Sequence, residues 1–172
     1  MGKKCISIVV PMYNEQESLQ ILYRELNRVT REMGDYDFEY LFVNDGSKDA
    51  TLQKIRELAA EDERVHYLSF SRNFGKEAAL LAGLSYAKGD YVTTMDADLQ
   101  DDINVVDQFV DKYHDGCDIV YGVRSSRKTD TVFKRGTAGM FYKFMRLLGV
   151  DIIDNHADYR LISRRVKIKK LH

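Results

Sequence analysis

The sequence predicts an α/β fold, with a doubly wound, mostly parallel sheet and helices on both faces. Short apolar, β-branched runs alternate along the chain with longer segments whose apolar residues recur every three or four positions. Each run ends in a polar, loop-forming segment, as strands buried on both faces do before the next helix. With 172 residues, 44% of them apolar, the chain can bury one core, and we expect residues 1–172 to form a single domain.

The first strand and helix have the clearest patterns. Residues 5–10 are an apolar run closed by Pro11, which predicts a buried parallel strand. The apolar residues that follow lie at spacings of three and four and define one face of a helix. They are Leu19, Leu22, Leu26, Val29 and Met33.

The same alternation continues to residue 121. Strands are predicted over 38–43, 65–70, 91–95 and 119–121, and helices over 52–58, 78–87 and 106–113. In doubly wound sheets, ligands bind beyond the carboxyl ends of the strands. The polar segments there are 11–15, 44–47, 71–76, 96–102 and 122–124. Any one of them could be a simple turn, but five at one edge favour a binding site.

The acidic segment 96–101, with the sequence Asp-Ala-Asp-Leu-Gln-Asp, directly follows the fourth predicted strand. If the strand breaks into a turn there, Asp96 and Asp98 can converge on one ion. A hard cation such as Mg²⁺ takes one or two carboxylates and completes its coordination with water and phosphate oxygens. The segment therefore predicts a metal-bound phosphate ester. The alternative is an acidic turn that caps the next helix.

Charge is divided unevenly along the chain. Residues 1–126 hold 14 Lys and Arg against 23 Asp and Glu, whereas residues 127–172 hold 12 against 4. A basic third on an acidic domain favours phosphates or an anionic membrane surface as partner, and no nucleic acid is expected. No apolar run approaches the roughly 18 residues of a membrane span. We expect the domain itself to be soluble, at the cytoplasmic face of the membrane.

Three motifs in order resemble those of family-2 glycosyltransferases with the GT-A fold. They are residues 9–15 (Val-Val-Pro-Met-Tyr-Asn-Glu), 43–51 (Val-Asn-Asp-Gly-Ser-Lys-Asp-Ala-Thr) and 96–101. Gln100 and the downstream Asp-Tyr-Arg-Leu at 158–161 make the chain similar to the polyprenyl-phosphate glycosyltransferases, the dolichyl-phosphate mannose synthase and bactoprenol glucosyltransferase type. The resemblance spans roughly residues 5–165. One departure is Asp102-Ile103, where the family usually has prolines.

The resemblance implies an inverting, metal-dependent transfer of a hexose. The donor would be a nucleotide diphosphate sugar, a UDP-sugar in preference to a GDP-sugar. The acceptor would be a polyprenyl phosphate of the undecaprenyl or dolichyl type. Arg124 and Arg135 suit bidentate contact with phosphates, and Lys76 adds a point charge. The donor-binding residues are then Pro11, Tyr13, Asn14, Glu15, Asp45, Lys76, Asp96 and Ala97. Mg²⁺ or Mn²⁺ would be bound by Asp96, Asp98 and Gln100, and the resemblance makes Asp158 the candidate catalytic base.

Other functions stay open at this stage. A saccharide acceptor in cell-wall or surface polysaccharide synthesis is one alternative. A nucleotidyltransferase that makes sugar nucleotides is disfavoured, since the first loop is not Gly-rich and basic. The chain has neither Gly-x4-Gly-Lys-Ser/Thr nor Gly-x-Gly-x-x-Gly, which argues against P-loop and dinucleotide-binding proteins. A non-catalytic nucleotide-sugar-binding fragment is also open, because the family continues into a membrane region and the chain is expected to be truncated before it. A homo-oligomer is left open.

The basic third is expected to form the acceptor and membrane side. Residues 134–148 fit an amphipathic helix with an apolar stripe beside a basic face. The tail at 164–170 adds five Lys and Arg, each worth roughly 1 kcal/mol near an anionic leaflet.

Overall fold

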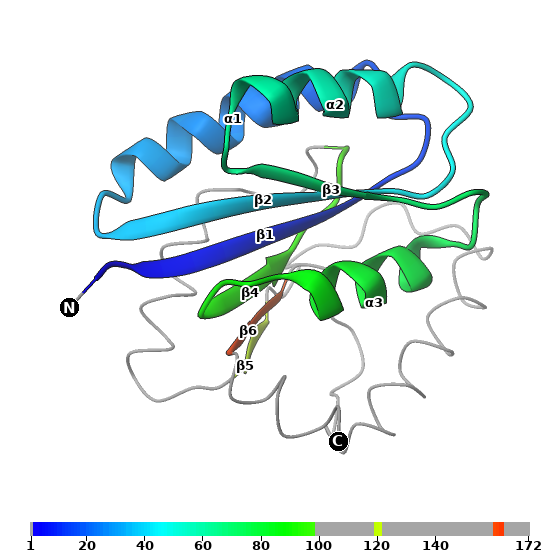
Figure 1. The fold of residues 1–172 in the computed structure, drawn as a ribbon. Helices are drawn as coiled ribbons and strands as arrows, with labels where there is room; N and C mark the ends of the chain where they lie inside the picture. The colour runs from blue at the N-terminus through cyan, green and yellow to red at the C-terminus, as the bar shows by residue number, and fades with distance from the viewer. Residues whose placement is uncertain (1, 99–118, 122–159, 164–172) are drawn as a thin grey trace, which may run out of the picture.

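The computed structural model of the chain describes residues 2–98, 119–121 and 160–163 (Figure 1). The elements in order are β1 (Lys4–Met12), α1 (Ser18–Glu32), β2 (Tyr36–Asn44), α2 (Thr51–Glu61), β3 (Val65–Ser69), α3 (Lys76–Tyr86), β4 (Tyr91–Thr94), β5 (Ile119–Tyr121) and β6 (Arg160–Ser163). The strands and helices predicted up to residue 95, and the strand at 119–121, are confirmed. The helices predicted over 106–113 and 134–148 lie outside the described residues.

The described strands form one sheet in the order β3-β2-β1-β4-β6-β5. Strands β1 to β4 are parallel, whereas β6 runs antiparallel to both of its neighbours, β4 and β5. The sequence did not predict β6, since its four residues, Arg-Leu-Ile-Ser, form no apolar run and are followed by a basic segment. The predicted fold class, a mostly parallel sheet with helices on both faces, is confirmed.

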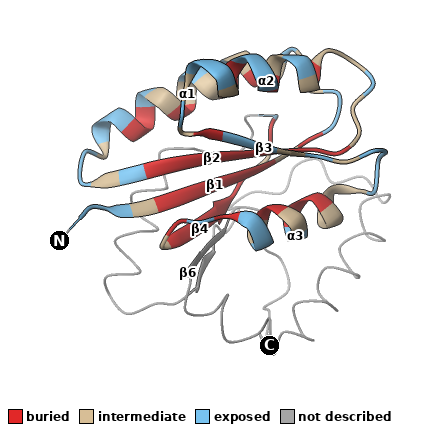
Figure 2. Cartoon of the chain, in the orientation of Figure 1, coloured by how far each residue is buried: buried red, intermediate tan, exposed pale blue. Residues whose placement is uncertain are grey.

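Two helical layers cover the sheet. Helices α1 and α2 lie along one face and α3 lies along the other (Figure 1). Successive side chains of a strand point to opposite faces. Accordingly Ile8 and Val10 of β1 join the core under α1 and α2, while Val9 joins the core under α3. Burial on both faces explains why the central strands are continuous apolar runs (Figure 2).

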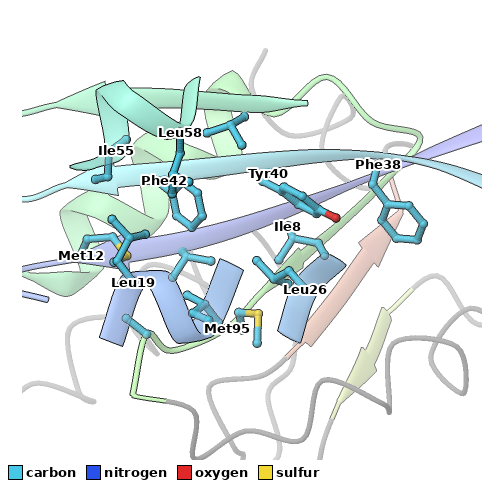
Figure 3. Packing of buried hydrophobic residues seen from close by; sticks show 14 of the residues in the cluster. Ile8, Met12, Leu19, Leu26, Phe38, Tyr40, Phe42, Ile55, Leu58 and Met95 are labelled. Carbon is cyan, nitrogen blue, oxygen red and sulfur yellow. The ribbon is translucent and has the colours of Figure 1, made fainter. Parts of the chain in front are cut away.

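The larger core lies between the sheet and the helices α1 and α2. The stripe predicted for α1 is buried at Leu19, Leu22, Leu26 and Val29, while Met33 follows the end of the helix and is partly buried. The stripe packs with strand side chains such as Phe42 (Figure 3). Met95, the last residue before the acidic segment, is 1% exposed and belongs to this core. The acidic segment therefore begins at an anchored point of the chain.

On the other face, α3 lies very close to β1. A Cβ added to Gly83 would lie 2.2 Å from Cγ1 of Val9, so only glycine fits there without displacing the strand side chain. Because Val is branched at Cβ and Val9 is fully buried, its methyl groups have little room to turn away. Gly83 thus sets the height of α3 above the sheet, and with it the position of the first residue of the helix, Lys76.

We expect Gly83→Val to destabilise the fold by about 2 kcal/mol, since overpacking a dense core costs about 1–3 kcal/mol. Ser85→Val is the matched control, because Ser85 lies on the same helix and is exposed; it should stay within about 0.5 kcal/mol of wild type. Urea unfolding followed by circular dichroism measures both. Equal midpoints for the two variants would contradict the close approach of α3 to β1.

Candidate functional site

The carboxyl ends of β1 to β4 lie at one edge of the sheet. In the strand register Met12 is opposite Asn44, Asn44 is opposite Ser69, and Val9 is opposite Thr94. The segments that leave these strands form what we call the loop edge, residues 13–17, 45–50, 70–75 and 95–98. The helix after β1 covers one face of the sheet and the helix before β4 covers the other (Figure 1). The boundary between β1 and β4 is therefore a topological switch point, where such sheets bind ligands.

Asn14 locks the first loop onto the second. Its φ of 56° lies in the left-handed region, which Asn tolerates better than most residues. Its backbone N–H donates to Oγ of Ser47 at 3.0 Å, and its side-chain Oδ1 accepts from the backbone N–H of Lys48 at 2.8 Å. Asn14 was predicted to bind the nucleotide. The structure shows that its backbone N–H and its side-chain oxygen also hold residues 47 and 48 in place.

The first loop makes further hydrogen bonds to the start of α2. The N–H of Glu15 donates to Oγ1 of Thr51 at 2.8 Å, and the N–H of Ala50 donates to Oε1 of Gln16 at 3.0 Å. Lys54 also donates to the carbonyl oxygen of Gln16, at 2.7 Å. The sequence did not single out Gln16, because nothing in its local pattern reveals a partner more than 30 residues away.

Asp45 holds the third loop. It is 3% exposed, and its two carboxylate oxygens accept the backbone N–H groups of Phe74 at 2.7 Å and of Gly75 at 2.9 Å. A buried carboxylate needs such donors, since an unpaired buried charge is very costly. Asp45 was predicted to bind the nucleotide sugar donor. The structure gives this side chain a second task, which is to position the segment that leads into α3.

The glycine after Asp45, Gly46, allows the second loop to lie against the third. Gly46 has a φ of 66°, and a Cβ on it would lie 2.3 Å from the carbonyl carbon of Arg72. The backbones of the second and third loops therefore touch at residues 46 and 72, with no room for a side chain between them. Next to this contact, the guanidinium of Arg72 lies 4.8 Å from the ring centre of Phe74, which is 53% exposed.

The predicted metal ligands lie at the end of β4. The side chain of Asp96 is 22% exposed, Ala97 is buried and Asp98 is exposed. Lys76, the first residue of α3, places its Nζ 2.6 Å from Oδ1 of Asp96. The structure thus brings together two residues that were assigned to the donor site from motifs 20 positions apart.

These donor atoms fit a hard divalent cation. Carboxylate oxygens are the ligands that Mg²⁺ and Mn²⁺ prefer, and one or two of them suffice when water and phosphate supply the rest. The ammonium of Lys76 shows that Asp96 already accepts a cation at short distance. Within residues 2–98, 119–121 and 160–163, no group of three or more His, Cys, Asp or Glu could hold a metal. Among the described residues, the candidate metal ligands are the carboxylates of Asp96 and Asp98.

Tyr13 and Pro11 complete the described part of the predicted site. Tyr13 is 41% exposed, and Pro11, the second-last residue of strand β1, is partly buried. The remaining predicted site residues, Gln100, Arg124, Arg135 and Asp158, lie outside the described residues, as does the basic tail at 164–170. Strand β5 ends at Tyr121, which pairs with Arg160 at the start of β6, and Arg160 in turn pairs with Thr94. Both strands therefore meet the loop edge at those residues.

Comparison with known proteins places the chain among glycosyltransferases. Residues 7–169 match the family model described as glycosyl transferase family 2. A bactoprenol glucosyl transferase from Shigella phage SfV is 47% identical over 162 residues, which cover 94% of this chain and 52% of that protein. The uncharacterised glycosyltransferase YkoT from Bacillus subtilis (strain 168) is 48% identical over 167 residues, covering 93% and 50%. The chain spans about half the length of these curated relatives.

Solved structures support the predicted GT-A fold. A mannosyltransferase from Pyrobaculum calidifontis, in complex with GDP-Man and Mn²⁺, matches 97% of this chain and 46% of its own with a TM-score of 0.65 at 18% identity. The glucosyl-3-phosphoglycerate synthase from Mycobacterium tuberculosis, in complex with UDP, matches 94% and 57% with a TM-score of 0.59 at 19% identity. At these identities the likeness shows the fold, and the GT-A prediction is confirmed.

We expect Asp45→Asn to loosen the third loop, because an amide offers one acceptor oxygen where two N–H groups need one each. A hydrogen bond to a charged group is worth about 1.5–3 kcal/mol, so exchange of the Phe74 and Gly75 amide hydrogens should speed up about tenfold or more. Hydrogen exchange read by NMR measures this. Asp37→Asn, an exposed residue at the far end of β2, is the control and should change neither amide. Unchanged protection in Asp45→Asn would contradict the tethering role.

Proposed function

This chain belongs to glycosyl transferase family 2, and we propose that it moves a sugar from a nucleotide diphosphate sugar to a polyprenyl phosphate. The observation that carries the proposal is the contact of Lys76 with Asp96 at the loop edge, where a cation and carboxylates can meet a diphosphate. The name of the phage relative, a bactoprenol glucosyl transferase 47% identical to this chain, favours a polyprenyl phosphate over a saccharide as acceptor.

The donor is proposed to lie across the loop edge at the switch between β1 and β4. Tyr13 presents an exposed ring there, and an aromatic face suits a nucleobase. We propose a UDP-sugar as donor. The solved proteins that share the fold were obtained with UDP in one case and with GDP-Man in another, so the fold is compatible with either base.

Mg²⁺ or Mn²⁺ is proposed to be held by Asp96 and Asp98 together with Gln100. When bound, such an ion stabilises the negative charge that develops on the departing nucleoside diphosphate. Two solved complexes of the same fold contain Mn²⁺, which supports the choice of metal. They are the Pyrobaculum mannosyltransferase with GDP-Man and a complex of the Mycobacterium synthase with UDP and glucosyl-3-phosphoglycerate. The oxygen chemistry of the two carboxylates supports it independently.

The side chains of the chain itself divide the remaining work. Lys76, in the first turn of α3, offers its ammonium to the diphosphate, and Arg124 and Arg135 are proposed to contact phosphate oxygens. Inverting transfer requires the acceptor oxygen to attack the sugar C1 from the side opposite the leaving diphosphate. A phosphate acceptor is already anionic near neutral pH, because its second pKa is about 6. Asp158 is proposed as the base that orients this acceptor or, for an alcohol, removes its proton. Residue 158 lies two positions before the start of β6, which begins at the loop edge.

The acceptor lipid is proposed to approach from the basic third of the chain, residues 127–172. A surplus of Lys and Arg would draw this part towards an anionic leaflet and bring a lipid phosphate towards the donor. Within the described residues, no helix has both the length and the apolar character needed to cross a bilayer. The surplus of Lys and Arg supports the proposal that this part associates with the membrane surface, at its cytoplasmic face.

We expect UDP-glucose to raise the melting temperature of the chain in Mn²⁺ and to lose most of this effect in EDTA. A ligand that binds only the folded state adds about 2.7 kcal/mol at 100 times its dissociation constant. Asp98→Asn should remove the Mn²⁺-dependent part of the shift, since it removes one of two carboxylates, whereas the exposed Asp35→Asn should keep it. GDP-mannose in parallel tests the base. A full shift for wild type in EDTA, or for Asp98→Asn in Mn²⁺, would overturn the metal assignment.

We expect Asp158→Asn to impair transfer to undecaprenyl phosphate while donor binding survives. Loss of a general base costs on the order of 10²–10⁴ in rate, and the smaller losses apply to an acceptor that is already an anion. Radiolabelled UDP-sugar with undecaprenyl phosphate or with a polyprenol measures both reactions, and calorimetry with UDP measures donor binding. If the variant folds but no longer binds UDP, Asp158 belongs to the donor site; a wild-type rate would remove it from the mechanism.

A further inference from the structure

The closest ion pair at the loop edge joins the helix α3 to the acidic segment after β4. Nζ of Lys76 lies 2.6 Å from Oδ1 of Asp96, and the two side chains are 35% and 22% exposed. This is the short distance of a charge-assisted hydrogen bond. Arg64 and Asp62 form a pair of the same length, 2.6 Å, just before β3 and away from the loop edge, whereas Lys4 and Asp90 lie 3.4 Å apart and are more exposed.

The backbone of Lys76 is held from two sides. Asp45 fixes the two preceding residues through their N–H groups, at 2.7 and 2.9 Å. Further along α3, the contact of Gly83 with Val9 fixes the height of the helix above the sheet. The fold therefore fixes the backbone position of Lys76, from which its ammonium reaches Asp96.

We propose that Lys76 is a resident counter-ion of the metal-binding carboxylates, and that it leaves Asp96 for the donor diphosphate when the metal enters. The inference rests on the proposed function and deepens it. A divalent ion on Asp96 would lie within a few ångströms of the ammonium, and two cations that close repel each other in a partly buried site. The metal alone therefore binds weakly. A diphosphate removes the conflict, because its negative charge accepts both cations.

Lys76 then couples the two ligands of the site. By linkage, whatever the diphosphate adds to metal affinity the metal adds to diphosphate affinity, and Lys76 carries part of this mutual effect. The exchange is a movement of the Lys76 ammonium from a carboxylate to the diphosphate. Its consequence is that free Mg²⁺ or Mn²⁺ binds the site only weakly in the absence of a donor.

The test measures Mn²⁺ binding without any nucleotide, by EPR of free Mn²⁺, in wild type, Lys76→Met and Lys76→Arg. We expect Lys76→Met to bind Mn²⁺ about fivefold or more tightly than wild type, since typical coupling factors between sites begin there. Lys76→Arg keeps the cation and should stay near wild type. Lys4→Met is the matched control, because it removes a lysine that pairs with an aspartate at the opposite edge of the sheet, and it should change nothing.

A second readout uses UDP. In saturating Mn²⁺, calorimetry should show weaker UDP binding for Lys76→Met than for wild type, because the diphosphate has lost a cation. Opposite changes for metal and nucleotide are the signature of the exchange. A lysine with a merely structural role would weaken both ligands or neither, and either result would overturn the proposal.

Asp98→Asn separates this inference from the proposed function. If Asp98→Asn loses Mn²⁺ while Lys76→Met binds it like wild type, the metal site stands and the counter-ion role of Lys76 is wrong. If Asp98→Asn binds Mn²⁺ like wild type, the metal site itself is wrong, and the role of Lys76 falls with it.

Discussion

The buried carboxylate of Asp45 is the contact on which the rest of the loop edge depends. Its two oxygens accept hydrogen bonds from the N–H groups of Phe74 and Gly75. Because Gly46, next to Asp45, has no side chain, the backbone of Arg72 can approach it closely. A carboxylate in this position costs free energy unless it is paired, so its pairing with backbone donors specifies a single loop arrangement. The parallel sheet brings the loops to one edge, and Asp45 fixes the third loop relative to the second.

Asn14 likewise connects two loops. Its left-handed backbone and its side-chain oxygen connect the first loop to the second through Ser47 and Lys48. Residues that resemble donor-binding motifs are therefore also the residues that hold the loops together. A substitution at such a position changes both binding and loop geometry, and amide exchange in the neighbouring loop is the measurement that separates the two effects.

Most of the described fold could be predicted from the sequence, because it depends on local patterns. The run at 5–10 and the stripe from Leu19 to Val29 correspond directly to β1 and α1. Strand β6 could not be predicted, since its residues, Arg160–Ser163, form no apolar run and its partners lie more than 30 residues away. For the same reason the motifs predicted candidate site residues but not the contact of Lys76 with Asp96 or the hydrogen bonds of Gln16. These contacts form only when segments that are distant in the sequence meet in the fold.

The pairing of β5 with β6 has a consequence for how such a protein can change. Tyr121 pairs with Arg160, so the 38 residues from 122 to 159 leave the sheet and return to it at the same place. Closing a longer loop costs little, about 0.6 kcal/mol for each doubling of its length. This stretch can therefore be lengthened, shortened or exchanged while strands β1 to β4 and their loops keep their positions.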